Sequence, residues 1–550
     1  MFIVLRGRVL VFHIAINLVI IGVVISVWSW LNAPTPPPRI GISGISPALI
    51  QGLLPNTELG KIYHGTPSEL LEHLEKGELD YLVELDEPTS SFANWFLGYL
   101  VPAIVVPFFD PSGEITMQEL MDILNGEPHS VVVSEVLALP GFPWFGLPVR
   151  YLPSAEVIQE LTTGHGKLGI IPVQDRTPSV RVVPLSQVDP CQPLDPPSTY
   201  PLSRTIYLSR AERNLANRLK DRYNESKGKS LDEIRLAALE STYFNPWANQ
   251  IKFVAVGDIM LDRDVEKVGL QKGWEHIFSE VAPFIQEADL AFANLESPIG
   301  DKGRFINMFQ APPEAVQGIA YAGFDVVSLA NNHTLDFHIE GMFETMRLLE
   351  EHGIDWVGAG QDIHAARSPL IKEIGGIKVG FLSYTEMWFV YTREPISWQA
   401  TQDEPGVAPA RLETIVDDVT KLRDLVDVVI VSVHWGKEYV HEPTAEQFTL
   451  ARAAVDAGAH LVLGHHPHVL QGIEFYQHGV IAYSLGNFVF DINLPKTWET
   501  MILDFTLSPS GVRDLTIVPA YIFGVQPHIL QGSHRDAVYR QIRHYSLKLR

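Results

Sequence analysis

The chain has 550 residues, more than the roughly 250–300 that one hydrophobic core usually reaches, so we expect at least two domains. Hydrophobic residues make up 46% and charged residues 19% of the chain, which excludes a disordered or collagen-like protein. The formal net charge of −24 argues against nucleic-acid binding, and it means that an anionic substrate would need a local site such as a metal ion.

Residues 1–32 are predicted to form a cytoplasmic end followed by a transmembrane anchor. Residues 9–31 contain no Asp, Glu, Lys or Arg, and as a helix they would span roughly 34 Å, enough for a bilayer. Arg6 and Arg8 precede this run, so the positive-inside rule places the amino terminus in the cytoplasm and the main body outside. The prediction is therefore a single-pass protein of the cell membrane, with a cleaved signal peptide and a buried helix as the alternatives.

The next segments are predicted to be a spacer, a domain and a connector. The proline-rich residues 33–40 form a stiff spacer, and residues 41–212 alternate strand-like and helical patterns, which indicates a smaller α/β domain. We expect strands at 81–84, 103–107, 130–133 and 167–172, and helices at 67–76 and 116–125. Residues 213–249 read as a helical connector. Cys191, the only cysteine, excludes an intramolecular disulfide and a cysteine-based zinc site.

Residues 250–550 carry a second and stronger α/β pattern. Six apolar runs there end in residues of the metal-ligand type: Asp258; Glu296; Asn331, Asn332 and His333; His434; His465, His466 and His468; and Asn487. Ligands of open α/β sheets bind beyond the carboxyl ends of the strands, so all six sets could gather at one edge. Carboxylates, amide oxygens and imidazoles suit divalent Zn, Mn or Fe.

These residues resemble the CapA family of capsule and poly-γ-glutamate biosynthesis proteins, which shares the calcineurin-like metallophosphoesterase fold. The similar strings run in order through residues 251–491: GDIMLDR at 257, NLESP at 294, ANNHTLD at 330, HWGKEY at 434, GHHPHV at 464 and YSLGNF at 483. The resemblance implies an α/β/β/α sandwich with its site on one edge. It further implies one or two divalent ions held by Asp258, Glu296, Asn332, His434, His466 and His468, with His333 as the catalytic acid or base. Two such ions can activate a water for in-line displacement.

Two positions depart from related patterns. Met260 stands where metallophosphoesterases usually have a histidine ligand, which leaves open one tight metal instead of two. His338 stands where the CapA family more often has glycine, and we interpret it as a surface substitution. Trp435 and Tyr439 are interpreted either as part of a substrate groove or as core residues.

Residues 41–212 show a weaker resemblance to phosphate-type periplasmic solute-binding proteins. The similar strings are ITMQELMDILNG at 115, GKLGIIP at 166 and YPLSRTIYL at 200. A working solute-binding module and a spacer or docking surface both remain open for this domain.

Together these observations predict a membrane-anchored, extracytoplasmic metallohydrolase of capsule, poly-γ-glutamate or related envelope-polymer biosynthesis. A metal-activated water would attack a phosphoester or related bond. The alternative is a non-catalytic, metal-containing component of assembly or export that binds an anionic polymer. The expected partners are that polymer or its precursor, a polymer synthase or export complex, and the membrane, but no nucleic acid.

Overall fold

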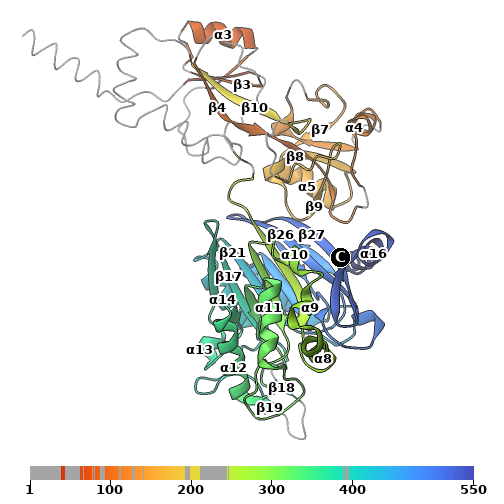
Figure 1. Cartoon of the computed structure of the whole chain (residues 1–550). Helices are drawn as coiled ribbons and strands as arrows, with labels where there is room; N and C mark the ends of the chain where they lie inside the picture. Colours follow the sequence, from red (N-terminus) through yellow and green to blue (C-terminus); the bar gives the residue numbers. More distant parts are fainter. Residues whose placement is uncertain are drawn as a thin grey trace, which may run out of the picture. The chain divides into compact units, whose positions relative to one another are not determined.

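The computed structural model (Figure 1) describes residues 39–43, 62–65, 67–76, 78–79, 81–86, 93–110, 113–126, 130–139, 142–192, 199–210, 245, 247–387, 389–390 and 396–549. The predicted anchor at 9–31, most of the spacer and most of the connector lie outside these residues. Within the described ranges, no helix is both long and apolar enough to cross a bilayer. The chain divides into two compact units, residues 1–176 with 182–248, and residues 177–181 with 249–550.

The N-terminal part contains two five-stranded sheets with a similar arrangement of strands. The first sheet runs β2 (Ile62–Gly65), β1 (Ile40–Ser43), β3 (Tyr81–Leu85), β10 (Arg204–Arg210) and β4 (Ala93–Leu100). The second runs β7 (Arg150–Leu152), β6 (Val131–Ser134), β8 (Leu168–Pro172), β5 (Pro102–Pro107) and β9 (Val180–Val183). In each sheet three parallel strands are followed by one antiparallel strand from elsewhere in the chain, β10 or β5.

The helices of this part include α3 (Pro67–Glu75), α4 (Met117–Leu124) and α5 (Ser154–Thr162). The four strands and two helices predicted by range in this part are confirmed within one or two residues. α4 begins where it does because Thr116 and Glu119 form a capping box. The strand-like string at 200–208 begins only at Arg204, because the Ser203 N–H donates to the Tyr200 carbonyl and closes a turn first.

The C-terminal unit contains two larger sheets. One has the order β14 (Asp355–Val357), β13 (Val326–Ser328), β12 (Leu290–Leu295), β11 (Ile251–Ile259), β26 (Glu499–Ser508), β27 (Gly511–Phe523) and β28 (Gln526–Ile529), with β25 (Asn487–Val489) also paired to β11. The other has the order β16 (Leu370–Ile374), β17 (Ile377–Thr385), β21 (Val428–His434), β22 (Leu461–His465), β24 (Gly479–Ala482) and β23 (Ile473–Tyr476).

The two sheets pack face to face, with helices on their outer faces. Phe253 and Phe292 of the larger sheet each lie against Phe381 of the smaller one, with ring centroids 6.0 and 5.9 Å apart. Alternate residues of β11, Val254 and Val256, point the other way into a core that includes residues of α9 (Trp274–Phe278), α11 (Val316–Ala322) and α12 (His338–Glu351). One face of β11 therefore packs against the smaller sheet, and the other face packs against the helices. The mixed α/β prediction is confirmed.

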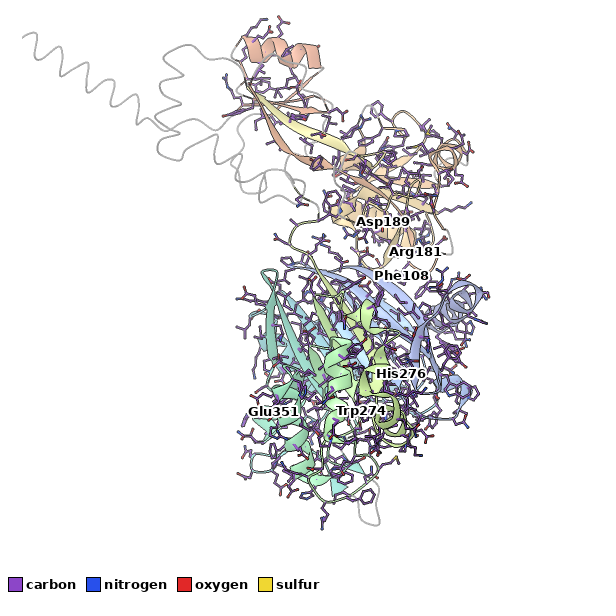
Figure 2. All side chains as sticks on the ribbon, viewed as in Figure 1. Phe108, Arg181, Asp189, Trp274, His276 and Glu351 are labelled. Atoms are coloured by element: carbon purple, nitrogen blue, oxygen red, sulfur yellow. The ribbon has the colours of Figure 1, made fainter. Side chains whose placement is uncertain are left out.

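The smaller sheet is covered by α14 (Leu412–Leu422) and α15 (Ala445–Ala457), whose apolar side chains share a core with β17, β21 and β22. Figure 2 labels two contrasting residues on the other side of the sandwich. Trp274 is buried in the helical layer, whereas Glu351 ends α12 in solvent and pairs with Arg347 at 2.6 Å. The exposed helix end therefore stabilises the fold little, because surface ion pairs contribute on the order of 0–1 kcal/mol.

Candidate metal centre

The carboxyl ends of parallel strands in both sheets meet at the site. β11, β12 and β13 are mutually parallel, and so are β17, β21, β22 and β24. Every position predicted to bind metal lies at or just after one of these strand ends. Two contacts join the sheets there: the His466 backbone N–H donates to Asp258 Oδ2 at 3.2 Å, and His434 Nε2 lies 2.7 Å from Asn332 Oδ1.

All six predicted ligands are brought together, and five of them fall into two overlapping triads. Asp258, Glu296 and His434 form one triad, and Glu296, His466 and His468 form the other, with the ligand atoms of each within 4.8 Å of one another. Asn332 joins the first triad through its contact with His434. Glu296 belongs to both triads, which is the arrangement of a carboxylate shared between two ions.

Glu296 is the least satisfied side chain of the cluster. It is fully buried, and neither carboxylate oxygen accepts a hydrogen bond; His434 Nε2 and His468 Nε2 each lie 3.7 Å from Oε1. His466 Nδ1 is also buried without a hydrogen-bond partner. An unpaired buried carboxylate costs several kcal/mol. A divalent cation would remove that cost, so the residues present fit a metal ion.

The electrostatics of the two carboxylates differ. Burial raises the pKa of Glu296 well above its ordinary value, and the nearby charge of Asp258 adds to the rise. Burial also acts to raise the pKa of Asp258, but hydrogen bonds from His465 and His468 outweigh it and hold that pKa well below the ordinary value. Asp258 is therefore the carboxylate that carries a negative charge in this site. Glu296 would ionise readily only with a cation beside it.

Two imidazoles of the cluster, those of His434 and His466, are neutral near pH 7. Burial lowers the pKa of His434 well below its ordinary value, with a further contribution from His466. Burial, together with His468, lowers the pKa of His466 to about 3. A neutral imidazole keeps the lone pair that a metal requires. His468 is also oriented, because Asn487 Oδ1 accepts from its Nδ1 at 2.8 Å and leaves Nε2 toward Glu296.

His333 lies beside the cluster and forms a separate pair with Asp336. Its Nδ1 donates to Asp336 Oδ2 at 2.7 Å, and its Nε2 lies 3.0 Å from Asn332 Nδ2. Asp336 Oδ2 also accepts the backbone N–H groups of Met308 and Phe309, which hold the carboxylate in place. The arrangement would suit an oriented acid–base imidazole next to a predicted metal ligand, Asn332.

Backbone geometry at the site is unusual. His466 and His468 have φ of 94° and 57°, a region that non-glycine residues seldom adopt. Gly257, just before Asp258, allows a close approach that no other residue would: a Cβ there would lie 1.9 Å from the Gly486 carbonyl oxygen. This contact is what allows β25 to pair with the end of β11.

Sequence reasoning did not assign roles to several supporting residues. Asn294 Nδ2 donates to Asp258 Oδ1 at 2.9 Å, and Asn331 Oδ1 accepts the His333 backbone N–H at 3.0 Å. His465 Nδ1 lies 3.2 Å from Asp258 Oδ1. Among the supporting residues, only Asp336 could have been inferred from the sequence. It follows His333 by three positions, a spacing that lets the two side chains meet across a short turn.

The structure shows the surroundings of the four residues whose roles the sequence left open or assigned to the surface. Met260 is fully buried, and its sulfur accepts the Asp262 N–H, so it packs instead of binding metal. Trp435 is core, with its indole N–H donating to the Tyr483 carbonyl. Tyr439 is half-buried, and its ring lies 5.9 Å from that of His468. His338 is on the surface as predicted and contacts Glu340 at 2.9 Å.

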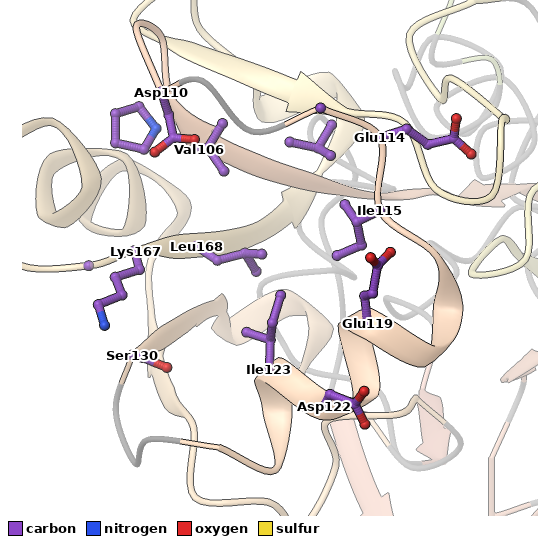
Figure 3. Close-up of a pocket in the computed structure, with 14 residues that line it drawn as sticks. Val106, Asp110, Glu114, Ile115, Glu119, Asp122, Ile123, Ser130, Lys167 and Leu168 are labelled. Carbon is purple, nitrogen blue, oxygen red and sulfur yellow. The ribbon is translucent and has the colours of Figure 1, made fainter.

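A cavity of about 660 Å³ lies in the N-terminal part (Figure 3). Its lining combines apolar residues such as Ile123 with four carboxylates, those of Asp110, Glu114, Glu119 and Asp122. Glu119 already accepts hydrogen bonds from Thr116 in the capping box of α4. The cavity therefore shows no arrangement comparable to the metal cluster.

Comparison with known proteins gives the family. The family described as "Bacterial capsule synthesis protein PGA_cap" matches residues 252–492, which include the whole cluster. The "Capsule biosynthesis protein CapA" of Bacillus anthracis is 32% identical over 305 residues, covering 53% of this chain and 73% of that protein. The chain belongs to the CapA family. The "PGA biosynthesis protein CapA" of Bacillus subtilis is 34% identical over 278 residues, covering 50% of this chain and 72% of the relative.

One solved structure resembles part of the chain at low similarity. An ABC-type phosphate transport receptor from Vibrio cholerae aligns with 36% of this chain and 98% of its own, at 18% identity and a TM-score of 0.28. A similarity this low carries no argument about what the N-terminal part binds.

Proposed function

We propose that this CapA-family protein is a membrane-anchored, extracytoplasmic metallohydrolase of envelope-polymer biosynthesis. The observation that carries the proposal is the fully buried carboxylate of Glu296, shared by two triads and without a hydrogen-bond donor. The substrate would be poly-γ-glutamate or a related anionic polymer or precursor, since the Bacillus relatives are named for capsule and PGA biosynthesis.

The donor set identifies the chemistry that the residues serve. Asp258, Glu296, Asn332, His434, His466 and His468 would hold one or two ions of Mn, Zn or Fe. When bound, such ions would activate a water and polarise a phosphoester or related bond.

The remaining work falls to residues of the chain itself. Asp336 keeps the proton of His333 on Nδ1, so Nε2 keeps its lone pair. That lone pair faces Asn332 Nδ2 and would take or return a proton at the reacting centre. Asn487 holds His468 in one orientation, and Trp398 donates its indole N–H to the Asn332 carbonyl at 2.9 Å. Both contacts limit movement of the donor set, which keeps the reacting groups aligned.

The proposal is tested on the purified full chain by measuring bound metal and hydrolysis of poly-γ-glutamate and of a generic phosphodiester. Glu296→Gln should lose both the metal and the turnover. Glu340→Gln, an exposed acid on α12, is the matched control and should keep both. A folded wild-type protein that binds no metal would contradict the proposal.

The same samples test the alternative of a non-catalytic assembly or export component. The family and the two Bacillus relatives are named for capsule or PGA synthesis, which is the observation that favours this alternative. Metal-dependent retention of poly-γ-glutamate without cleavage would support this alternative and exclude hydrolysis.

A further inference from the structure

Arg263 places a positive charge at the edge of the metal centre. It is the first residue of α8 (Arg263–Lys272) and follows Asp258 by five positions. Its φ of 58° lies in the left-handed region, and Asp262 Oδ1 accepts its backbone N–H at 2.6 Å. The chain therefore holds Arg263 in a conformation that costs energy, which points to a specific position for its side chain.

The guanidinium of Arg263 lies over two aromatic rings that contact the site. Its Cζ is 4.8 Å from the centroid of Phe309 and 5.9 Å from that of Phe490. The Phe309 ring is 4.3 Å from the His333 ring, and the Phe490 ring is 5.0 Å from the His468 ring. One aromatic layer thus separates Arg263 from the acid–base histidine and from a metal ligand. Cation–π contact fixes the guanidinium there.

Lys496 supplies a second charge on another side of His468. Its Nζ donates to the Tyr439 carbonyl at 2.8 Å and lies 5.7 Å from the Tyr439 ring centroid. That ring is 5.9 Å from the His468 ring. Tyr439, like Arg263, has a positive φ, of 62°. Two cations therefore approach one metal ligand, each through an aromatic neighbour.

Both cations remain accessible to an anion. The Arg263 side chain is 40% exposed although it pairs with Asp491, whose own side chain is 8% exposed and which also accepts the Asp264 N–H at 3.1 Å. Asp491 thus anchors one side of a guanidinium that has five N–H donors. Lys496 is exposed and donates to a neutral carbonyl, a contact that leaves its charge uncompensated. The chain as a whole has a net charge of −24, so these two exposed cations give the edge of the site a local positive charge that the rest of the protein does not supply.

We propose that Arg263 and Lys496 form an anion-binding subsite that holds carboxylates of the polymer beside the metal centre. The inference rests on the proposed function, because it assigns the substrate of the same centre. Arg263 offers a planar pair of donors suited to a carboxylate, and Lys496 offers a point charge. The bulk charge of the protein repels a polyanion, so local cations are what would bring it to the metal.

The test measures binding of a poly-γ-glutamate oligomer to the metal-loaded full chain by calorimetry, so that it does not depend on turnover. Arg263→Gln and Lys496→Gln should each weaken binding roughly tenfold, the value of one hydrogen bond to a charged group. Lys267→Gln is the matched control, because Lys267 is an exposed cation on the same helix, paired with Asp264. It should change binding less than twofold.

Further measurements separate a direct role from damage to the fold. Arg263→Lys keeps the charge but loses the planar pair of donors, so it should restore only part of the binding. Bound metal should be the same in all variants. The oligomer with esterified carboxylates should bind all variants equally weakly. Polyphosphate of equal charge tests whether carboxylates are preferred, and equal sensitivity to Arg263→Gln with both polymers would overturn a carboxylate-specific subsite. Unchanged binding in Arg263→Gln, or equal loss in Lys267→Gln, would overturn the subsite altogether.

The two proposals fail in different ways. If the protein binds metal and the oligomer but cleaves nothing, the hydrolysis proposal is wrong. The subsite is then still tested by how strongly the Arg263 and Lys496 variants bind the oligomer. If cleavage occurs and the variants bind like the wild type, the proposed function survives and the subsite does not.

Discussion

His333 Nδ1 lies 2.7 Å from Asp336 Oδ2, and both side chains are buried at the edge of the metal cluster. Because Met308 and Phe309 also donate to this carboxylate, Asp336 cannot turn away from the imidazole without losing backbone hydrogen bonds. The position of the pair is therefore fixed. Substitution of His333 and substitution of Asp336 are expected to lower the activity by different amounts.

The first prediction concerns this pair. His333→Ala should lower kcat by about 10²–10⁴, the usual contribution of a general acid or base. Asp336→Asn should lower kcat less and shift the pH profile, because an amide no longer stabilises the protonated imidazole. Steady-state kinetics across pH 5–9 provide the measurement. His338→Ala is the control, since that exposed histidine lies five residues after His333 and contacts Glu340. Full activity in His333→Ala would remove the acid–base role.

The second prediction concerns metal and stability. A chelator should lower the Tm of the wild-type protein, because an ion that binds only the folded state stabilises it by mass action, about 3 kcal/mol at a hundredfold excess over Kd. His466→Ala should have a Tm that no longer responds to chelator or to added Mn or Zn. Differential scanning calorimetry with and without metal checks this. An unchanged wild-type Tm on metal removal would contradict a metal bound in the folded core.

The third prediction concerns Gly257. A methyl group at this position would lie 1.9 Å from the Gly486 carbonyl oxygen, a backbone atom that cannot rotate away. Gly257→Ala should therefore destabilise the protein by roughly 1–3 kcal/mol or more and displace Asp258 from the cluster, with loss of bound metal. Thermal unfolding and metal analysis give the readout. Gly113→Ala is the control, because no heavy atom lies within 4 Å of its added Cβ, and an equal effect there would refute the steric argument.

The fourth prediction concerns pH and His460, which lies away from the metal ligands. Its Nδ1 accepts the Val429 N–H at 3.1 Å, and burial lowers its pKa from 6.5 to about 4. The unfolded chain therefore takes up a proton between pH 6.5 and about 4 that the folded protein resists, so stability falls as pH falls through this window, by roughly 3 kcal/mol.

His460→Gln can still accept from Val429 but does not titrate, so its stability should fall less over that window. Urea denaturation at pH 7, 5.5 and 4.5 compares the two proteins. Parallel curves for the wild type and His460→Gln would show that His460 does not carry the pH dependence.

Much of the site could be read from the chain order of the residues. Asp258, Glu296 and His434 each follow an apolar run, and strand ends in parallel sheets converge, so their proximity was predictable. The nature of the ligands was also readable, because carboxylate, amide and imidazole groups are chemically distinct in the sequence. The strand pattern of the N-terminal part was predictable for the same reason, except at residues 200–203, where one backbone hydrogen bond delays the strand.

Other features exist only because two separate sheets meet. Nothing local distinguishes Trp435, which is core, from Tyr439, which borders the site four residues later; the packing of α15 and β24 decides it. Likewise, the contact of Gly257 with Gly486 joins positions more than two hundred residues apart.

The sequence by itself therefore determined the membership of the site: which strand ends carry ligand atoms and which residue types they offer, since local periodicity and side-chain chemistry are properties of the chain. The tertiary structure was needed to show the distances among the ligand atoms, the backbone contacts that fix Asp336, and the cations that border the cluster. Those properties depend on distances of a few ångströms between segments remote in sequence, and such distances are set by how the two sheets pack.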